Sequence, residues 1–189
     1  MSALAQAGFY LIVALVVAAL VHFAVILTLP LVAERDAYSR LAAMGPVGPT
    51  IALPAAGPSE RNFTQQDPAV ASAFCRYDLS NGPVRVRAPV GRAGFAALSF
   101  HSRRGAAFYA LTDRGATHGR MEAVIATAAQ KRALVAEDDE DDPSEDLRIV
   151  SPTLDGFVLI RVFSPLPSLY PQAAADAAAL ACAPEPAAK

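Results

Sequence analysis

The sequence lacks the short motifs that identify common catalytic sites. It contains no Gly-x-Ser-x-Gly nucleophile elbow, no His-Glu-x-x-His zinc motif and nothing that resembles a P-loop or a dinucleotide-binding fingerprint. Its formal net charge of −2 gives no general basic character for nucleic-acid binding. The sequence therefore favours a non-enzymatic role, with no catalytic residues, no cofactor, no metal site and no nucleic-acid partner.

Charged side chains are absent from the first 33 residues. Within this segment Phe9 to Leu29 is almost wholly apolar, and an apolar helix of this length spans about 30 Å, the hydrocarbon thickness of a bilayer. A cleaved signal peptide has a shorter apolar core of about 7–15 residues that follows a basic segment. No Lys or Arg precedes the run here. We therefore predict a retained membrane anchor over residues 1–33, in contact with lipid through residues 9–29, with the helix ending at Pro30.

Cysteine is almost absent as well, and its two residues, Cys75 and Cys182, bracket the rest of the chain. A single disulfide that joins the first strand to the last helix would explain the pair, and such bonds persist in oxidising compartments. Two buried thiols in a cytosolic protein are the alternative. The basic residues Arg35 and Arg40 follow the apolar run and favour a cytosolic domain by the positive-inside rule. We give the cysteines more weight and predict a single-pass protein of the bacterial inner membrane with a periplasmic domain.

Proline and glycine punctuate residues 34–72, which we interpret as an irregular connector. A short helix at about residues 33–43 that continues from the anchor is compatible with its sequence. Residues 73–183 then show short runs with period-two alternation and turn signals, typical of strands. Thr127 opens a capping box that predicts a helix. The expected strands are 74–79, 84–87, 94–102, 106–112, 121–126, 147–150 and 156–163, the expected helices are 128–135 and 172–181, and residues 184–189 are a tail.

This pattern predicts a mainly β (α+β) fold, an antiparallel sandwich or jelly-roll-like domain with two short helices attached to one transmembrane helix. We expect Tyr77, Phe100, Phe108 and Tyr109 to lie in its core.

Two segments, CRYDLSNGPVRVRAPV and SFHSRRGAAFYALTDR, resemble the bacterial proteins that carry the domain of unknown function 1254, most closely the short, membrane-anchored members. The resemblance implies a β-rich domain with no established activity and no assigned catalytic residues. Longer members carry a second domain, of unknown function 1214, which we do not find in this sequence. The resemblance therefore suggests a separately encoded partner that carries this second domain.

Charge is segregated along the β-rich region. Residues 76–132 hold ten Lys or Arg and three acids, whereas residues 133–155 hold nine acids, six of them consecutive from Glu137 to Asp142, and only Arg148 as a base. The basic segment suggests a face for an anionic ligand or partner; mutual neutralisation is the alternative. The acidic run does not match an EF-hand loop, because Pro143 and Ile149 stand where glycine and glutamate are needed.

A ligand cleft is the second functional hypothesis. Its candidate lining residues are Arg85, Arg87, His101, Arg103 and Tyr109. A hydrolytic Ser99–His101–Asp113 arrangement is disfavoured, because residues i and i+2 on one strand face are about 6–7 Å apart. The leading hypothesis is a non-catalytic interaction or accessory module of the cell envelope that acts with a partner protein; the alternative is a periplasmic small-ligand-binding protein or hydrolase that uses this cleft.

Overall fold

The computed structural model describes residues 2–32, 36–57, 66–116, 119–138 and 144–186. The chain forms two compact units, Met1–Asp36 and Ala37–Lys189. The helices are α1 (Ala3–Val32), α2 (Ala37–Ala42), α3 (Ala128–Ala136) and α4 (Tyr170–Ala178). The strands are β1 (Ile51–Ala52), β2 (Val70–Asp78), β3 (Val84–Pro89), β4 (Ala96–Ser102), β5 (Ala107–Thr112), β6 (Arg120–Ala126), β7 (Arg148–Val150), β8 (Asp155–Phe163) and β9 (Ala181–Pro184).

The first unit consists of α1, which is apolar on all sides. Its segment Ala3–Leu29 is long and apolar enough to cross a membrane, a criterion that a signal sequence also meets. The hydroxyl of Thr28 donates a hydrogen bond of 2.7 Å to the carbonyl oxygen of Ala24, so this polar group needs no partner outside the helix. The helix continues through Pro30 to Val32, and the prediction that it ends at Pro30 was wrong.

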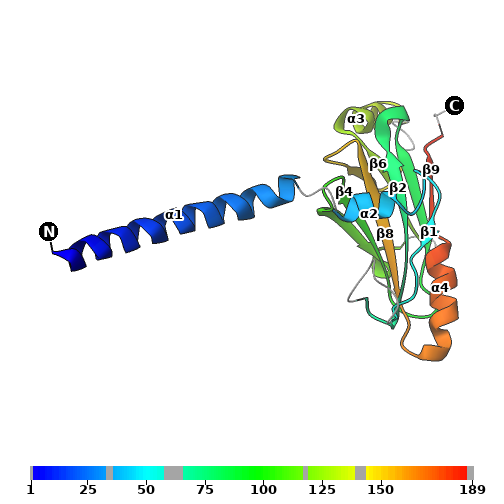
Figure 1. The fold of residues 1–189 in the computed structure, drawn as a ribbon. Helices are drawn as coiled ribbons and strands as arrows, with labels where there is room; N and C mark the ends of the chain where they lie inside the picture. The colour runs from blue at the N-terminus through cyan, green and yellow to red at the C-terminus, as the bar shows by residue number, and fades with distance from the viewer. Residues whose placement is uncertain (1, 33–35, 58–65, 117–118, 139–143, 187–189) are drawn as a thin grey trace. The chain divides into compact units, whose positions relative to one another are not determined.

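The second unit is a sandwich of two sheets (Figure 1). Among the described residues, one sheet has five strands in the order β1-β2-β8-β4-β5, and the other has four in the order β7-β6-β3-β9. The two long strands β2 and β8 pair antiparallel over their whole length, from Val70 opposite Phe163 to Asp78 opposite Asp155. The α+β sandwich is confirmed, but β7 runs parallel to β6, so the four-stranded sheet is mixed.

Alternation of buried and more exposed positions, strictest along β3 and β4, directs side chains into the core between the sheets. Strand β4 alternates buried and half-buried positions at every residue, which directs Leu98 and Phe100 to the interior. Tyr77 and Phe100 are fully buried as expected, whereas Phe108 is only partly buried and Tyr109 remains 38% exposed at an edge strand. Each large apolar side chain that is completely buried contributes about 1.5–3 kcal/mol to the stability of the fold.

A second, smaller core lies on the outer face of the five-stranded sheet, where α2 packs. Tyr38 and Leu41 of α2 are buried there against Phe74, Phe157 and Leu159. The neighbouring segment adds β1 to the edge of β2. The connector predicted for residues 34–72 therefore differs from the structure, because from Ala37 onward the described part of this segment belongs to the folded unit. Periodicity does not predict this packing, because prolines and glycines interrupt any regular pattern in the segment.

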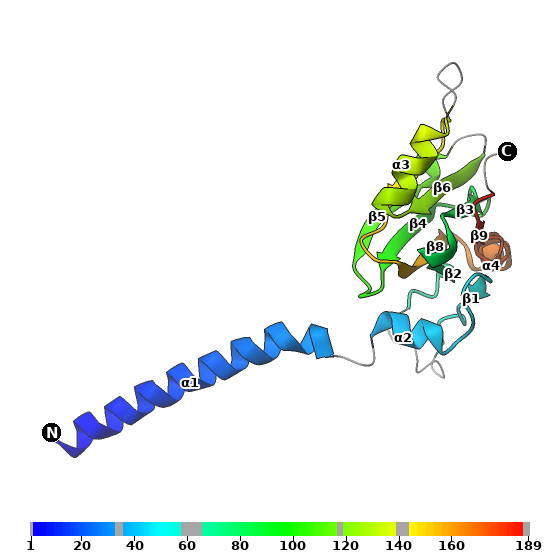
Figure 2. The same ribbon diagram turned by 90° about the horizontal axis from the view of Figure 1, so that it is seen from above.

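The two cysteines form a disulfide across a sequence separation of 107 residues. Cys75 lies on β2 of the five-stranded sheet, and Cys182 lies on β9, which pairs with β3 of the four-stranded sheet. The predicted bond is therefore confirmed, but it joins two strands. Helix α4 ends at Ala178, earlier than the sequence predicted, and leaves Cys182 to the strand that follows. Figure 2 shows α4 beside β1 and β9, at a different side of the sandwich from α3.

One glycine fixes a close approach inside the sandwich. Gly156 of β8 faces Tyr77, and any side chain at this position would overlap the Tyr77 hydroxyl and the carbonyl oxygen of His101. The bare backbone lets the Tyr77 hydroxyl donate to the His101 carbonyl at 3.0 Å and lie 2.9 Å from the Ser151 hydroxyl. Burial raises the pKa of Tyr77 to about 12, although the hydrogen bonds with Ser151 and Thr153 oppose this shift.

Candidate functional site

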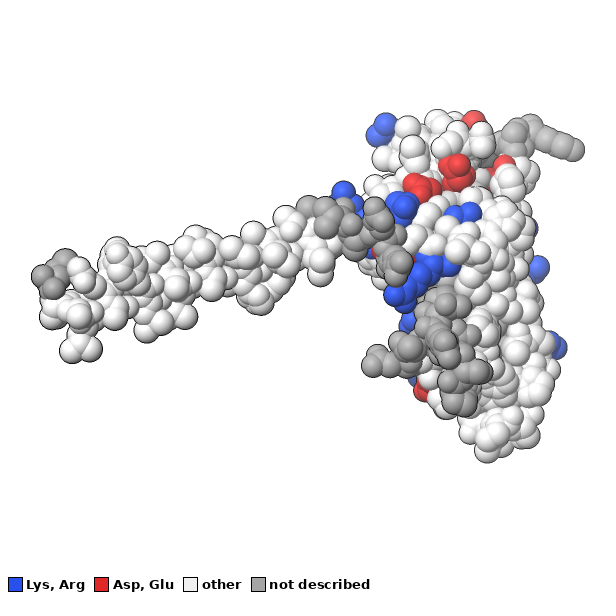
Figure 3. Space-filling view, viewed as in Figure 1, with Lys and Arg blue, Asp and Glu red and all other residues white. Residues whose placement is uncertain are grey.

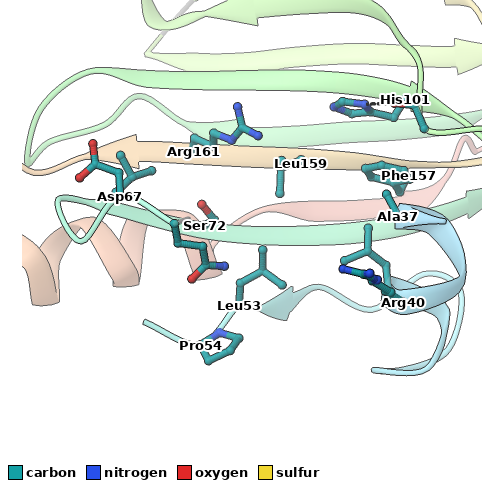
Figure 4. Close-up of a pocket in the computed structure, with 14 residues that line it drawn as sticks. Ala37, Arg40, Leu53, Pro54, Asp67, Ser72, His101, Phe157, Leu159 and Arg161 are labelled. Atoms are coloured by element: carbon teal, nitrogen blue, oxygen red, sulfur yellow. Dashed lines mark hydrogen bonds between the residues drawn. The ribbon is translucent and has the colours of Figure 1, made fainter. Parts of the chain in front are cut away.

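A hollow of about 630 Å³ lies on the outer face of the five-stranded sheet, beside α2 (Figure 4). Its volume falls within the range of about 300–1,000 Å³ that is typical of small-molecule sites. Aliphatic side chains form much of its lining, including Leu41, Leu53 and Leu159. The polar lining residues are Arg40, Gln66, Asp67, Ser72, His101 and Arg161.

The α2 side of the hollow is fixed by Tyr38. Two guanidinium groups approach its ring, with the central carbon of Arg76 5.3 Å and that of Arg103 4.1 Å from the ring centroid. Arg103 also forms an ion pair of 3.3 Å with Asp155. Burial raises the pKa of the Tyr38 hydroxyl, and the charge of Asp155 adds to this effect. Because α2 is held in this way, Arg40, one turn away from Ala37, keeps its place in the wall of the hollow.

The sheet side of the hollow carries Arg161, a charged residue that interrupts the apolar run of β8. It faces Ser72 across the β2–β8 pairing and Ala97 across the β4–β8 pairing. Its side chain is exposed, and it makes no hydrogen bond or ion pair with any residue that the structure describes. Lys and Arg atoms gather on this face of the unit, near the position of α2 (Figure 3). The hollow thus combines an aliphatic floor with guanidinium groups from two elements.

The imidazole of His101 is held in one orientation. Its ring stacks on Phe157 at a centroid distance of 4.6 Å, Nδ1 lies 3.0 Å from the Gly105 carbonyl oxygen and Nε2 lies 3.0 Å from the Ser99 hydroxyl. A carbonyl oxygen only accepts, so Nδ1 carries the proton. The Ser99 hydroxyl beside Nε2 also donates a hydrogen bond of 3.3 Å to the Leu159 carbonyl oxygen. The expectation that Ser99 and His101 are too far apart for this contact was wrong, because both side chains turn toward each other along the strand face.

Within the described residues, no acid contacts the His101 ring in the way that a catalytic triad requires. Asp113 follows β5 at the end where Thr112 pairs with Ala97, whereas His101 pairs with Ala107 at the opposite end of the same hairpin. Among the described residues, the group that orients His101 is therefore the Gly105 carbonyl. A backbone carbonyl can fix the tautomer, but it carries no negative charge to stabilise an imidazolium. The geometry thus favours a positioned lining residue over a general base.

Arg85 and Arg87, two of the predicted lining residues, lie away from this hollow on the outer face of the four-stranded sheet. Arg85 forms ion pairs with Glu122 at 2.7 Å, Asp146 at 2.5 Å and Glu185 at 2.6 Å. Arg87 pairs with Glu122 at 2.9 Å. These contacts raise the pKa of Arg85, chiefly through the hydrogen bond with Asp146. The ion pairs of Arg85 connect β3 with β6, with Asp146 in the segment before β7 and with Glu185, which follows β9.

The acids of this cluster are shifted in the opposite direction. Hydrogen bonding to Arg85 lowers the pKa of Asp146 despite partial burial. Burial acts to raise the pKa of Glu122, but its contacts with Arg85 and Arg87 outweigh that effect and lower it overall. Arg148 is likewise engaged by Asp138, through two hydrogen bonds of 2.6 Å. Mutual neutralisation thus accounts for the described ion pairs of the segregated charges. Residues 139–142, most of the acidic run, lie outside the described residues.

The other predicted residues are divided between locations. His101 lines the hollow, and Arg103 lies on the Tyr38 ring beside it. Tyr109 lies in a separate groove of about 490 Å³ between the edge strands β5 and β7, together with Phe108 and Ile149. The five residues therefore do not converge on one cleft. Within the described residues, no group of three or more His, Cys, Asp or Glu side chains is arranged to hold a metal ion.

Sequence reasoning missed Arg40, Ser72 and Arg161 as lining residues. Arg161 left a readable signal, because it interrupts the apolar run of β8 and shares its strand face with Phe157 and Leu159. No pattern in the sequence pointed to Arg40, because nothing in the short helix that carries it predicts that this helix packs beside β8. Ser72 was missed because β2 begins at Val70, four residues before the predicted start of the strand.

Comparison with solved structures finds a similar fold in a longer chain. The VPA0106 protein from Vibrio parahaemolyticus matches with a TM-score of 0.51 and 12% identity, over 80% of this chain and 36% of that chain. An uncharacterised protein from Burkholderia cenocepacia matches with a TM-score of 0.42 and 14% identity, over 69% of this chain and 37% of that one. This chain thus spans about a third of the length of these structures.

Comparison with curated proteins and with family models gives different results. No curated protein matches the chain. The family model described as "Protein of unknown function (DUF1254)" matches residues 50–184, from β1 to the end of β9. The segments that carried the resemblance in the sequence, around Cys75 and Phe108, lie within this match. The chain therefore belongs to the DUF1254 family.

Proposed function

We propose that the chain is a membrane-anchored protein of the bacterial envelope whose folded unit lies on the periplasmic side of the inner membrane. The observation that carries this proposal is the combination, in one chain, of a helix long enough to cross a bilayer and a disulfide between two strands. A disulfide of this kind persists where the compartment is oxidising. Arg35 and Arg40 favour the opposite orientation, but two basic residues are a weak topological signal.

The folded unit acts, in this proposal, as a non-catalytic accessory module that works with a second protein. The resemblance to longer family members suggests a separately encoded chain with the domain of unknown function 1214. The edge strand β5 supports a docking role, because Ala107–Thr112 carries no charged residue and no proline. Proteins usually protect exposed edges with such residues, and an unprotected edge is a template for pairing with another chain. Among the described residues, β5 pairs only with β4.

The orientation is tested by labelling introduced cysteines in the full chain. Arg132→Cys lies on the exposed surface of α3, and Ser2→Cys precedes α1. A membrane-impermeant maleimide, applied to cells with a permeabilised outer membrane, is expected to label Arg132→Cys and to reach Ser2→Cys only after lysis. The native pair, Cys75 and Cys182, is expected to react only after reduction. The reverse labelling pattern would place the folded unit in the cytosol and refute the proposal.

The partner is tested by co-expression with a tagged protein that carries the domain of unknown function 1214. A photoreactive phenylalanine at Tyr109 is expected to cross-link to that protein, because Tyr109 is an exposed residue of β5. The same residue at Arg132, on α3, is the matched control. Recovery of the monomer alone in mild detergent, with no cross-link from either position, would argue against a partner of this kind.

A further inference from the structure

We infer that the hollow beside α2 binds an anionic amphiphile, a molecule with a carboxylate or phosphate group on an aliphatic body. Arg161 holds the anionic group, and the aliphatic side chains of the floor contact the body. This site goes beyond the accessory role proposed above and does not depend on a partner protein. Either a free fatty acid or a membrane phospholipid has the required chemistry.

The position of Arg161 in the lining of the hollow indicates that the ligand is negatively charged. Its guanidinium has no carboxylate partner among the described residues, in contrast to Arg85 in the same domain. A guanidinium group binds carboxylates and phosphates through two parallel hydrogen bonds, which a neutral ligand cannot match. Arg40 in the opposite wall adds positive potential, and Asp67 is the one acid that lines the hollow within the described residues. The charged lining is therefore cationic overall.

The aliphatic side chains on the floor of the hollow indicate that the ligand has an aliphatic body. Leu41, Leu53 and Leu159 contribute alkyl surface, and Pro54 and Val70 extend it. The aromatic residue of the lining, Phe157, has a ring face covered by His101, so stacking of a flat ligand on that face is blocked. Burial of alkyl groups on this surface provides binding energy in proportion to the area removed from water. A ligand with a charged end and a saturated chain matches both parts of the hollow.

Polar residues beside the arginine can complete the recognition. Ser72 lies directly opposite Arg161 in the β2–β8 register and supplies a hydroxyl donor. His101 is fixed by Ser99 and Gly105, so its ring edge presents a constant surface to the hollow. Preorganised groups of this kind reduce the entropy that a ligand must overcome on binding.

The site is tested by photo-cross-linking on the full chain in phosphatidylcholine nanodiscs. The probes are a diazirine-bearing fatty acid, a diazirine-bearing phosphatidic acid and the alcohol that corresponds to the fatty acid. Labelled peptides are mapped by mass spectrometry, which separates labelling of the hollow, at Leu53 or Leu159, from labelling of α1 by lipid-dissolved probe. The acids are expected to label the hollow, and the alcohol only α1. The acidic probe that labels the hollow more strongly shows whether the ligand is a free fatty acid or a phospholipid.

Two variants and a control decide the outcome. Arg161→Gln is expected to reduce labelling of the hollow by about tenfold, the effect of losing one charge-assisted hydrogen bond. Ser72→Leu, which fills the hollow, is expected to abolish it. Arg132→Gln, an exposed arginine on α3, is expected to leave it unchanged, and circular dichroism checks that each variant is folded. Labelling of α1 alone, equal labelling by the alcohol, or no effect of Arg161→Gln would overturn the proposal.

Discussion

Each sheet of the sandwich carries an outward-facing arginine on a central strand, Arg85 on β3 and Arg161 on β8, and the two differ in exposure and in ion pairing. On the four-stranded sheet, the side chain of Arg85 is only 12% exposed and contacts three carboxylates among the described residues. On the five-stranded sheet, Arg161 is exposed and contacts no described carboxylate. Both side chains point outward from a central strand, so the position in the strand does not predict which arginine forms ion pairs.

The difference separates a structural arginine from one that is available for binding. A partly buried guanidinium loses hydration, and its ion pairs must replace that loss for the fold to remain stable. An exposed guanidinium keeps its water until a ligand displaces it. The sequence places Arg85 in the basic segment 76–132 and Arg161 outside it, but this position does not show which arginine is paired. The neighbours that distant segments supply to Arg85, namely Glu122, Asp146 and Glu185, distinguish the two.

The largest effect is expected from removal of the bond that couples the two sheets. In the chain-entropy model, a disulfide that closes a loop of about 100 residues stabilises by about 4–5 kcal/mol. The double variant Cys75→Ala/Cys182→Ala should lose free energy of unfolding of that order, measured by urea titration of the full chain. Reduction of the native protein should produce the same loss. A loss below about 1 kcal/mol in both would show that packing alone holds the sheets together.

A smaller but still large effect is expected from Arg85→Met. The substitution leaves the acids Glu122, Asp146 and Glu185 next to one another without the cation that they share. Removing one member of a buried ion-pair network costs about 3–5 kcal/mol, and partial exposure places this site at the low end. Urea titration at neutral pH measures the loss. An unchanged free energy of unfolding would show that the cluster contributes no more than a surface pair.

Acid should remove much of the contribution of this cluster. The pKa of Asp146 is lowered in the folded state by its hydrogen bond with Arg85, so the stabilisation is complete above the unfolded pKa, about 4, and is lost as the pH falls through the folded pKa. The stability difference between the native protein and Arg85→Met should therefore be smaller at pH 3 than at pH 7. Paired urea titrations at the two pH values measure it; a constant difference would contradict this assignment.

The smallest effect on stability is expected from Arg161→Gln. An exposed side chain without a described partner usually changes the free energy of unfolding by less than about 0.5 kcal/mol. The same urea titration applies, with Arg132→Gln as the matched control. A loss above about 1 kcal/mol would show that Arg161 is structural and would remove the contrast between the two sheets.

The sequence predicted the sandwich well where the local pattern was strong. Alternation located β3, β4, β5, β6 and β8 within a few residues, and the Thr127–Gln130 capping box located α3. In the segment before Val70, the short helix expected at about residues 33–43 corresponds to α2, but β1 and the packing of α2 on the sheet were not predicted. Both depend on contacts with the distant residues Phe74 and Ser72. The candidate site was predicted only through His101, since its other charged lining residues come from segments whose proximity no local pattern reveals.

The sequence by itself determined the apolar helix, the alternation that builds the core, the cysteine pair and the family. These properties depend on residue type and spacing along one stretch of chain, or, for the cysteines, on there being no other partner. Tertiary structure alone decided which arginines are neutralised and where a hollow remains. Both depend on how strands from distant parts of the sequence are ordered in the two sheets, and Coulomb interactions and packing act over distances in space, not along the chain.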